Sequence, residues 1–143
     1  PSRWQKQEKQ ILEKAEDLLE RFKLSHMRDE YAATLSGGQR KLLEMARALM
    51  SEPKLILLDE PMAGVNPVLV ESLLIHIENL RDEGVSVLFI EHDMDAIMGI
   101  SDWIVVLAEG QVIAEGTPSD VSKNPAVIDA YLGSAIAEEL KDV

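Results

Sequence analysis

The sequence predicts an α/β fold in which mainly parallel, buried strands are flanked by helices and followed by a β-hairpin and short helices. Two observations carry this prediction. Segments whose apolar residues recur with a helical period alternate with short, continuous apolar runs, which is the pattern of a layered α/β fold. The chain has 143 residues, of which 46% are hydrophobic, and this is enough for one globular domain with a core.

Composition excludes several classes of protein. The chain carries 26 Asp and Glu residues against 14 Lys and Arg, a formal net charge of -12. A nucleic-acid partner is not expected, because phosphate neutralisation needs clustered Lys and Arg. The absence of cysteine excludes disulfides, cysteine nucleophiles and thiolate metal sites. No apolar run approaches the roughly 18 residues of a membrane-spanning helix, and the first residues do not resemble a signal peptide.

The first expected element is an amphipathic helix over residues 7–24. Its apolar positions recur at steps of three and four residues and comprise Ile11, Leu12, Ala15, Leu18, Leu19 and Phe22. A coiled coil is the alternative, but the pattern lasts barely two heptads before Ser25 and His26 interrupt it, which is too short. We therefore expect this helix to pack its apolar stripe against another part of the same fold.

A second helix is expected over residues 36–50, with Ser36 as a possible N-cap and Pro53 just beyond its end. The apolar run 55–58 follows and closes on Asp59 and Glu60. Consecutive apolar residues predict a strand that is buried on both faces, as strands are in a parallel sheet.

The alternation continues to the C-terminal region. A helix over 68–83 with Gly84 as its stop signal precedes a second buried strand at 85–90. The later expected elements are a short helix from about residue 95, a strand at 103–108 that forms a hairpin with 111–114, and short helices after Thr117 and Asn124. Since ligand-binding groups gather at the carboxyl ends of parallel strands, the acidic endings after residues 58 and 90 mark the expected site.

The segment Ser36-Gly37-Gly38-Gln39 is the first candidate site. A serine and two glycines at a helix start leave backbone N–H groups uncovered, and the helix dipole adds partial positive charge, so a phosphate could bind there. The alternative is an ordinary serine cap with a glycine-rich entry turn, and capping preferences favour it when the tripeptide is considered alone.

Asp59 and Glu60 are the second candidate. One carboxylate at a strand end could hold a hard cation while the other serves as a base. Because adjacent side chains on a strand point to opposite sides, the two would act separately. A buried strand that meets solvent at a polar turn is an equally good interpretation of this run taken alone.

His92, just past the second buried strand, is the third candidate. It could donate a hydrogen bond to a phosphate or orient a water molecule. A lone histidine is more often structural, and we expect His26, in a loop, and His76, on a helix, to be so.

The order of these segments resembles the C-terminal part of the ATPase domain of ATP-binding cassette (ABC) transporters, which has a P-loop NTPase-like fold. Leu35–Gln39 matches the signature motif of that family, and Leu55–Asp59 followed by Glu60 matches its Walker B motif and catalytic glutamate. Pro61–Pro67 lies where the family has its D-loop, and His92 where it has its switch histidine. The resemblance extends from about Ala33 to Gly133.

Within the family, the ATPase subunits of branched-chain amino acid importers are the most similar. Residues 60–67, 90–94 and 98–102 and the ending 124–133 resemble that group, and Asn66 stands where most ABC ATPases carry aspartate. Related ATPases for urea transport or lipopolysaccharide export share much of this pattern.

The resemblance implies a role for each matching residue. In the family, two ATPase domains enclose two ATP molecules head to tail. Asp59 would hold Mg²⁺, Glu60 would act as the general base, and His92 would contact the γ-phosphate. The signature residues Ser36, Gly37, Gly38 and Gln39 would contact the ATP molecule held by the partner domain. Asn66 would link the two nucleotide sites across the dimer.

The resemblance also implies a division of the chain: 1–34 as a remnant of the helical subdomain, 35–133 as the C-terminal part of the ABC ATPase core, and 134–143 as a tail. The phosphate-binding loop G-x-x-x-x-G-K-[ST] does not occur in the sequence. We therefore expect the complete protein to be an ABC-type ATPase and this chain alone to be inactive, with some apolar surface left uncovered where absent strands would pack.

Implied partners are a second ABC ATPase domain (in a homodimer or heterodimer), transmembrane permease subunits and the missing N-terminal half of the same domain. The implied location is cytoplasmic, on the inner face of the cell membrane. The alternative function is a non-catalytic module, derived from an ABC ATPase, that dimerises or binds a partner.

Overall fold

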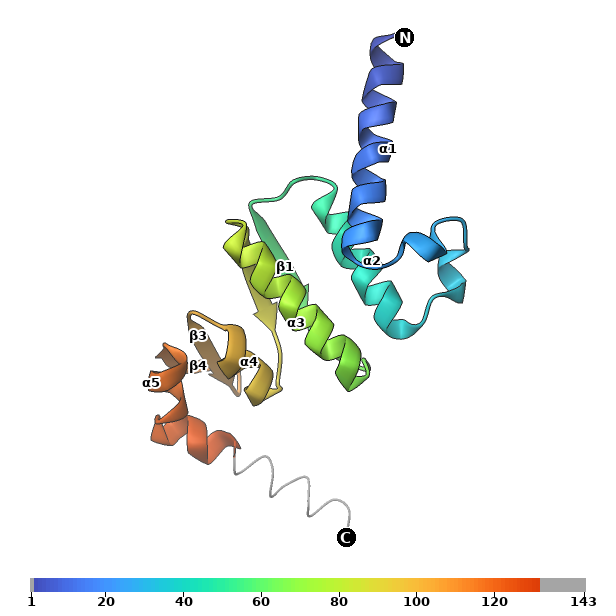
Figure 1. Cartoon of the computed structure of the whole chain (residues 1–143). Coiled ribbons are helices and arrows are strands. Elements are labelled where there is room, and N and C mark those ends of the chain that lie inside the picture. The colour runs from blue at the N-terminus through green and yellow to red at the C-terminus, as the bar shows by residue number, and fades with distance from the viewer. Residues whose placement is uncertain (1, 132–143) are drawn as a thin grey trace. The chain divides into compact units, whose positions relative to one another are not determined.

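The structure of the chain is a computed structural model that describes residues 2–131. It contains two compact units, divided between Glu91 and His92. The first unit holds α1 (Arg3–Arg21), two short 3₁₀ helices (Ser25–Met27 and Ala32–Thr34), α2 (Gly37–Leu49), β1 (Leu55–Asp59), α3 (Pro67–Asp82) and β2 (Ser86–Ile90). The second unit holds α4 (Met94–Ile100), β3 (Ile104–Ala108), β4 (Gln111–Gly116) and α5 (Pro118–Ser122) (Figure 1). The predicted α/β fold is confirmed, and the predicted tail at 134–143 lies outside the described residues.

The two strands of the first unit, β1 and β2, pair in parallel, as predicted. Their register runs from Leu55 opposite Ser86 to Asp59 opposite Ile90. The backbone N–H of Glu60 donates to the carbonyl oxygen of Ile90 over 2.9 Å. The ladder therefore continues one residue beyond the strand, to the residue that was predicted to be catalytic.

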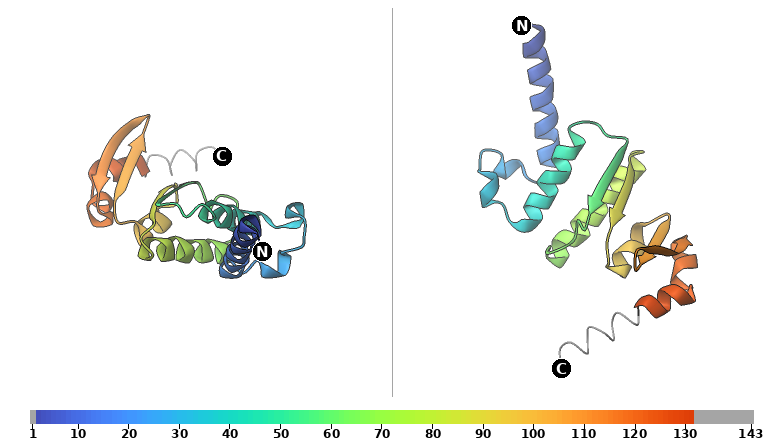
Figure 2. Two further views of the ribbon diagram at one scale, coloured as in Figure 1. Left: turned by 90° about the horizontal axis from the view of Figure 1, so that it is seen from above. Right: turned by 180° about the vertical axis from the view of Figure 1, so that it is seen from behind.

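The prediction that these strands are buried on both faces is wrong for the described residues. Side chains alternate along a strand, and those on the face toward α3 are covered, with Ile56 only 5% exposed. The opposite face carries Leu55, Leu57, Leu88 and Ile90, and all four are exposed, Leu57 by 66%. Figure 2 (right) shows the strand pair from this open side. The reason is that no described element of the unit packs there.

Helix α1 begins earlier than predicted and packs along only part of its length. Ser2 lies before it, and the Ser2 N–H donates to Oε1 of Gln5, which stabilises the first turn. The expected apolar stripe is half-buried at Leu18 and Leu19, whereas Ile11 and Leu12 are exposed. Figures 1 and 2 show the N-terminal half of α1 extending beyond α2. The stripe therefore packs only toward its C-terminal end.

The end of α1 is fastened to α3. Phe22, which is 1% exposed, packs on the ring of His76 from α3. The guanidinium of Arg21 donates two hydrogen bonds, of 2.9 and 2.7 Å, to the carboxylate of Glu83 at the end of α3. The structural role predicted for His76 is confirmed by its burial, and His26 lies exposed in a 3₁₀ helix.

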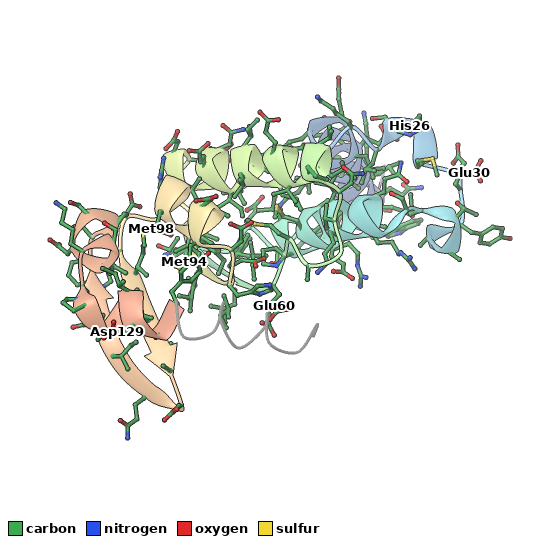
Figure 3. The ribbon with its side chains drawn as sticks, turned by 90° about the horizontal axis from the view of Figure 1, so that it is seen from below. His26, Glu30, Glu60, Met94, Met98 and Asp129 are labelled. Carbon is green, nitrogen blue, oxygen red and sulfur yellow. The ribbon has the colours of Figure 1, made fainter. Side chains whose placement is uncertain are left out.

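In the second unit, β3 and β4 form the predicted hairpin, which extends to Gly116. Glu109 and Gly110 turn the chain with φ of 50° and 75°, the two positive values that suit a two-residue hairpin turn. The core of this unit consists of Ile104, Ala114, Val121 and Val127, against which Met94 and Met98 pack from α4 (Figure 3).

Candidate functional site

The N-terminus of α2 is capped by its own residues. The Ser36 hydroxyl oxygen accepts a hydrogen bond from the Gln39 N–H over 3.2 Å, and Gln39 Oε1 accepts one from the Ser36 N–H over 2.9 Å. This capping box is the ordinary serine cap that the sequence analysis gave as the alternative. The expectation that the N–H groups here are uncovered is therefore wrong for Ser36 and Gln39. Two donors of the first turn remain, the N–H groups of Gly37 and Gly38, because this turn has no intrahelical acceptors.

The two glycines of the segment have different surroundings. Gly37 is exposed, and a Cβ there would meet nothing within 4 Å. Gly38 is buried, and a Cβ there would collide with the side chain of Leu69 from α3. The missing side chain of Gly38 therefore leaves room for the Leu69 side chain, and the exposed part of this helix start lies at Ser36 and Gly37.

Asp59 and Glu60 differ in backbone as well as in position. Asp59 is the last residue of β1 and is exposed. Glu60 is outside the strand, with a φ of 43° that places it in the left-handed region. The sequence-based argument that adjacent strand residues point to opposite sides therefore does not apply to Glu60, because the strand ends at Asp59. Glu60 is exposed as well, and its side chain points away from the ribbon (Figure 3).

The turn that carries Glu60 is held by hydrogen bonds from two other elements. Lys41 of α2 donates from Nζ to the Glu60 carbonyl oxygen over 3.0 Å. Glu91, just after β2, accepts from the Met62 N–H through Oε1 over 2.8 Å. Sequence reasoning did not single out Lys41, and it placed Glu91 at the expected site without assigning it a contact or a role. The only available signal was that Glu91 belongs to the acidic ending after residue 90.

Asn66 is the N-cap of α3. Its Oδ1 accepts a hydrogen bond from the Leu69 N–H over 3.0 Å, and Pro67 occupies the first helical position. Asparagine and aspartate cap helices about equally well. The departure from the aspartate that is common in this position therefore leaves the helix start intact.

The first unit contains every predicted site residue except His92, which is exposed and opens the second unit. Within the first unit, Lys41 joins α2 to the end of β1. A hollow of about 210 Å³ lies between these two elements, and its lining includes Lys41, Asp59 and Pro61. The hollow thus borders the carboxylate that was predicted to hold a cation.

The metal-binding capacity of this site is limited. Within residues 2–131, no group of three or more His, Cys, Asp or Glu side chains is arranged to hold a metal ion. Mg²⁺, however, is commonly bound through one or two carboxylates together with the phosphates of a substrate. A single exposed carboxylate such as Asp59 fits that mode and does not fit a site made of protein ligands alone.

Comparison with known proteins decides the family. Residues 2–63 match the model of the ABC transporter family, and residues 111–137 match that of the branched-chain amino acid ATP-binding cassette transporter. The probable branched-chain amino acid transport ATP-binding protein LivG of Archaeoglobus fulgidus is 50% identical over 136 residues, which are 95% of this chain. The chain belongs to the ABC transporter ATP-binding family.

Other members of the ABC family agree with this assignment. The lipopolysaccharide export system ATP-binding protein LptB of Escherichia coli is 40% identical over 85% of this chain. A solved ATP-binding cassette of an ABC transporter, in its ADP conformation, superposes with a TM-score of 0.78 at 43% identity over 87% of this chain. The chain spans about half the length of these ABC proteins: 53% of LivG, 50% of LptB and 50% of the solved cassette.

Within residues 2–131, no helix combines the length and apolarity that a membrane crossing requires.

Proposed function

We propose that this chain is the C-terminal part of an ATP-hydrolysing subunit that powers branched-chain amino acid import. The observation that carries the proposal is the arrangement at the end of β1. There Asp59 and Glu60 are exposed at the carboxyl end of a parallel strand, and Lys41 connects the Glu60 carbonyl oxygen to α2, the helix capped by Ser36. The match of residues 111–137 to the branched-chain amino acid type supports the transported substrate.

In this proposal Glu60 is the general base that accepts a proton from the attacking water, and Asp59 holds Mg²⁺ together with the nucleotide phosphates. His92 contacts the γ-phosphate. Asn66, the N-cap of α3, contacts the second site. Mg²⁺, when bound, supplies positive charge to the phosphate oxygens.

The start of α2 binds the γ-phosphate of an ATP molecule held by a second ABC ATPase domain. The N–H groups of Gly37 and Gly38 face no intrahelical acceptor and can donate to phosphate oxygens. Ser36 uses its oxygen as an acceptor within the cap, so its hydroxyl proton can donate as well. Gln39 contributes by holding the cap, since its side-chain oxygen is bonded to the Ser36 N–H.

The principal phosphate cradle has to come from another segment, because the loop G-x-x-x-x-G-K-[ST] does not occur in this sequence. The proposed source is an N-terminal half of the same domain, which packs on the open face of β1 and β2. Parallel sheets are almost always covered on both faces, and Leu57 and Leu88 are 66% and 58% exposed on this one. Permease subunits complete the assembly at the inner face of the cell membrane.

The test compares the 143-residue chain with the complete subunit. We expect no ATP turnover by the chain alone, turnover by the complete subunit, and loss of turnover in Glu60→Gln. Glu115→Gln, on an exposed strand residue, is the matched control and should retain activity. Uptake of labelled leucine, but not lysine, by cells with the complete transporter would support the substrate. ATP turnover by the isolated chain that disappears in Glu60→Gln would contradict the need for a second half.

A non-catalytic module that dimerises or binds a partner is the second candidate, and the open apolar face of β1 and β2 favours it. In this case the isolated chain should self-associate without ATP, and Leu57→Lys should abolish the association. Both candidates leave this face open in the isolated chain, so the complete subunit separates them. Sedimentation of the complete subunit should show a dimer only with ATP under the ATPase proposal, and a dimer without ATP under the module proposal.

A further inference from the structure

We infer that Glu91 is a positioning residue for Glu60: its carboxylate holds the turn that carries Glu60 in the orientation the reaction requires. This inference rests on the proposed function and adds a residue to it. No matching motif assigned a role to Glu91. Its place in the fold, one residue after β2, brings it to the turn that follows β1.

The contact is specific in geometry. Glu91 Oε1 accepts the Met62 N–H over 2.8 Å, a short distance for an N–H donor and typical of a charged acceptor. Met62 is only 7% exposed, so water cannot easily take the place of the carboxylate. Removal of Glu91 would leave a buried backbone donor without its acceptor, and the turn would have to rearrange to satisfy it.

The turn has a conformation that needs such support. Glu60 has a φ of 43°, and a non-glycine residue keeps a left-handed backbone only where the surrounding structure determines it strongly. Ile90 and Glu91 hold the turn at alternate residues, since Ile90 accepts the Glu60 N–H and Glu91 the Met62 N–H. Lys41 holds it from the side of α2 through the Glu60 carbonyl oxygen.

These bonds fix the backbone on both sides of the Glu60 side chain. Ile90 and Lys41 act at Glu60 itself, and Glu91 acts two residues later. Without Glu91 the segment from Pro61 onward loses its tie to β2 and the direction of the Glu60 side chain is no longer fixed. A general base must lie within hydrogen-bond reach of the water that it activates. The expected defect is therefore in the chemical step and not in nucleotide binding.

The test uses the complete subunit and measures kcat and KM for MgATP. In Glu91→Ala we expect kcat to fall by roughly 10- to 100-fold, the scale for a misplaced catalytic group, with KM within about twofold of the wild type. Glu91→Gln keeps a carbonyl oxygen of the same reach and should restore most of kcat. Glu115→Ala, at an exposed glutamate of β4, is the control and should be unchanged.

A second measurement follows the contact itself in the 143-residue chain. Amide hydrogen exchange at Met62 should accelerate in Glu91→Ala and stay slow in Glu91→Gln. If Glu91→Ala fails to fold, Glu91→Asp keeps the charge on a side chain one methylene shorter and should lower kcat without raising KM.

Two results would overturn the inference: an unchanged kcat in both Glu91→Ala and Glu91→Asp, or a Glu91→Gln variant as impaired as Glu91→Ala. Failure of the proposed function looks different, because Glu60→Gln would then retain turnover.

Discussion

His76 on α3 packs against Phe22 at the end of α1, with ring centroids 4.4 Å apart and planes tilted by 42°. His76 is buried, and within the described residues its Nδ1 has no hydrogen-bond partner. The surrounding charges are Arg21, the last residue of α1, and Lys23, two residues beyond it, with Glu83, just after α3, paired to Arg21. Burial is the main cause that lowers the pKa of His76, and the two cations lower it further.

This contact predicts a stability that depends on pH. Because the folded state disfavours the protonated imidazole, stability is full above the unfolded-state pKa of about 6.5. It is lost as the pH falls toward the lower folded-state pKa. Urea midpoints at pH 7.5 and 5.0 should therefore differ more for the wild type than for His76→Phe, which keeps the ring contact and cannot be protonated.

His26→Gln is the control for this experiment, because His26 is exposed, and it should keep the wild-type pH dependence. Two hydrogen-bonded carboxylates, Glu52 and Asp120, also make stability depend on pH, but in a more acidic range than His76 does. A hydrogen bond from Lys14 is the main cause that lowers the pKa of Glu52. A hydrogen bond from Thr117 is the main cause that lowers the pKa of Asp120. If His76→Phe lost as much stability between pH 7.5 and 5.0 as the wild type does, groups other than His76 would be responsible for the pH dependence.

Gly38→Ala should destabilise the chain by about 1–3 kcal/mol, because the added methyl group would overlap the side chain of Leu69. Gly37→Ala, one residue earlier with open space around it, should be neutral or slightly stabilising. Urea unfolding of both variants measures the difference. In the double variant with Leu69→Ala, the cost of Gly38→Ala should shrink, and equal costs in both backgrounds would disprove the overlap.

Asn66→Ala should cost about 0.5–2 kcal/mol through loss of the cap on α3. Asn66→Asp keeps an acceptor at the same place and should lie within a few tenths of a kcal/mol of the wild type. Thermal unfolding of the three proteins provides the comparison. Equal losses in both variants would mean that the amide NH₂ group, and not the cap, stabilises this residue.

Ile56 and Leu57 are neighbours on β1 with opposite surroundings, 5% and 66% exposed. In the isolated chain, Ile56→Ala should cost about 2–5 kcal/mol, and Leu57→Lys should change stability by less than about 0.5 kcal/mol. In the complete subunit, Leu57→Lys should impair assembly. Undiminished yield and ATP turnover of the complete Leu57→Lys subunit would contradict the proposed packing of an N-terminal half on this face.

In the complete subunit, Glu60→Gln should trap ATP in a closed dimer, because nucleotide binds and is not hydrolysed. Ser36→Arg should prevent closure, since a large side chain would fill the exposed start of α2. Size-exclusion chromatography with MgATP distinguishes the two outcomes as dimer and monomer. Wild-type ATPase rates in both variants would refute both role assignments.

Local sequence patterns predicted most elements, because helical period, capping residues and apolar runs act over a few positions. Ser36 as a cap and Gly84 as a stop are of this kind. Pairing and parallel direction of β1 and β2 followed from the alternation of strands and helices. The burial of both faces of β1 did not follow, because an apolar run such as 55–58 records the surroundings of the complete fold, and the described residues supply only one of its two covering layers.

Positions within the site were harder to predict than its motifs. Glu91 and Met62 are 29 residues apart and Lys41 and Glu60 are 19 apart, so no local pattern records their contacts. The predicted site motifs also say little about the proposed transported substrate. A lipopolysaccharide export protein shares 40% identity over 121 residues with this chain, and the branched-chain amino acid type is recognised in residues 111–137, which follow the predicted catalytic residues in the sequence.

The contact between Gly38 and Leu69 has a mechanical consequence. A Cβ at Gly38 would overlap a terminal methyl carbon of Leu69, so the Leu69 side chain occupies the space beside the first turn of α2. A displacement at Ser36 toward α3 should therefore be felt first by the Leu69 side chain. In the proposed dimer, closure on Ser36 should change the Leu69 rotamer and, through it, reach the start of α3.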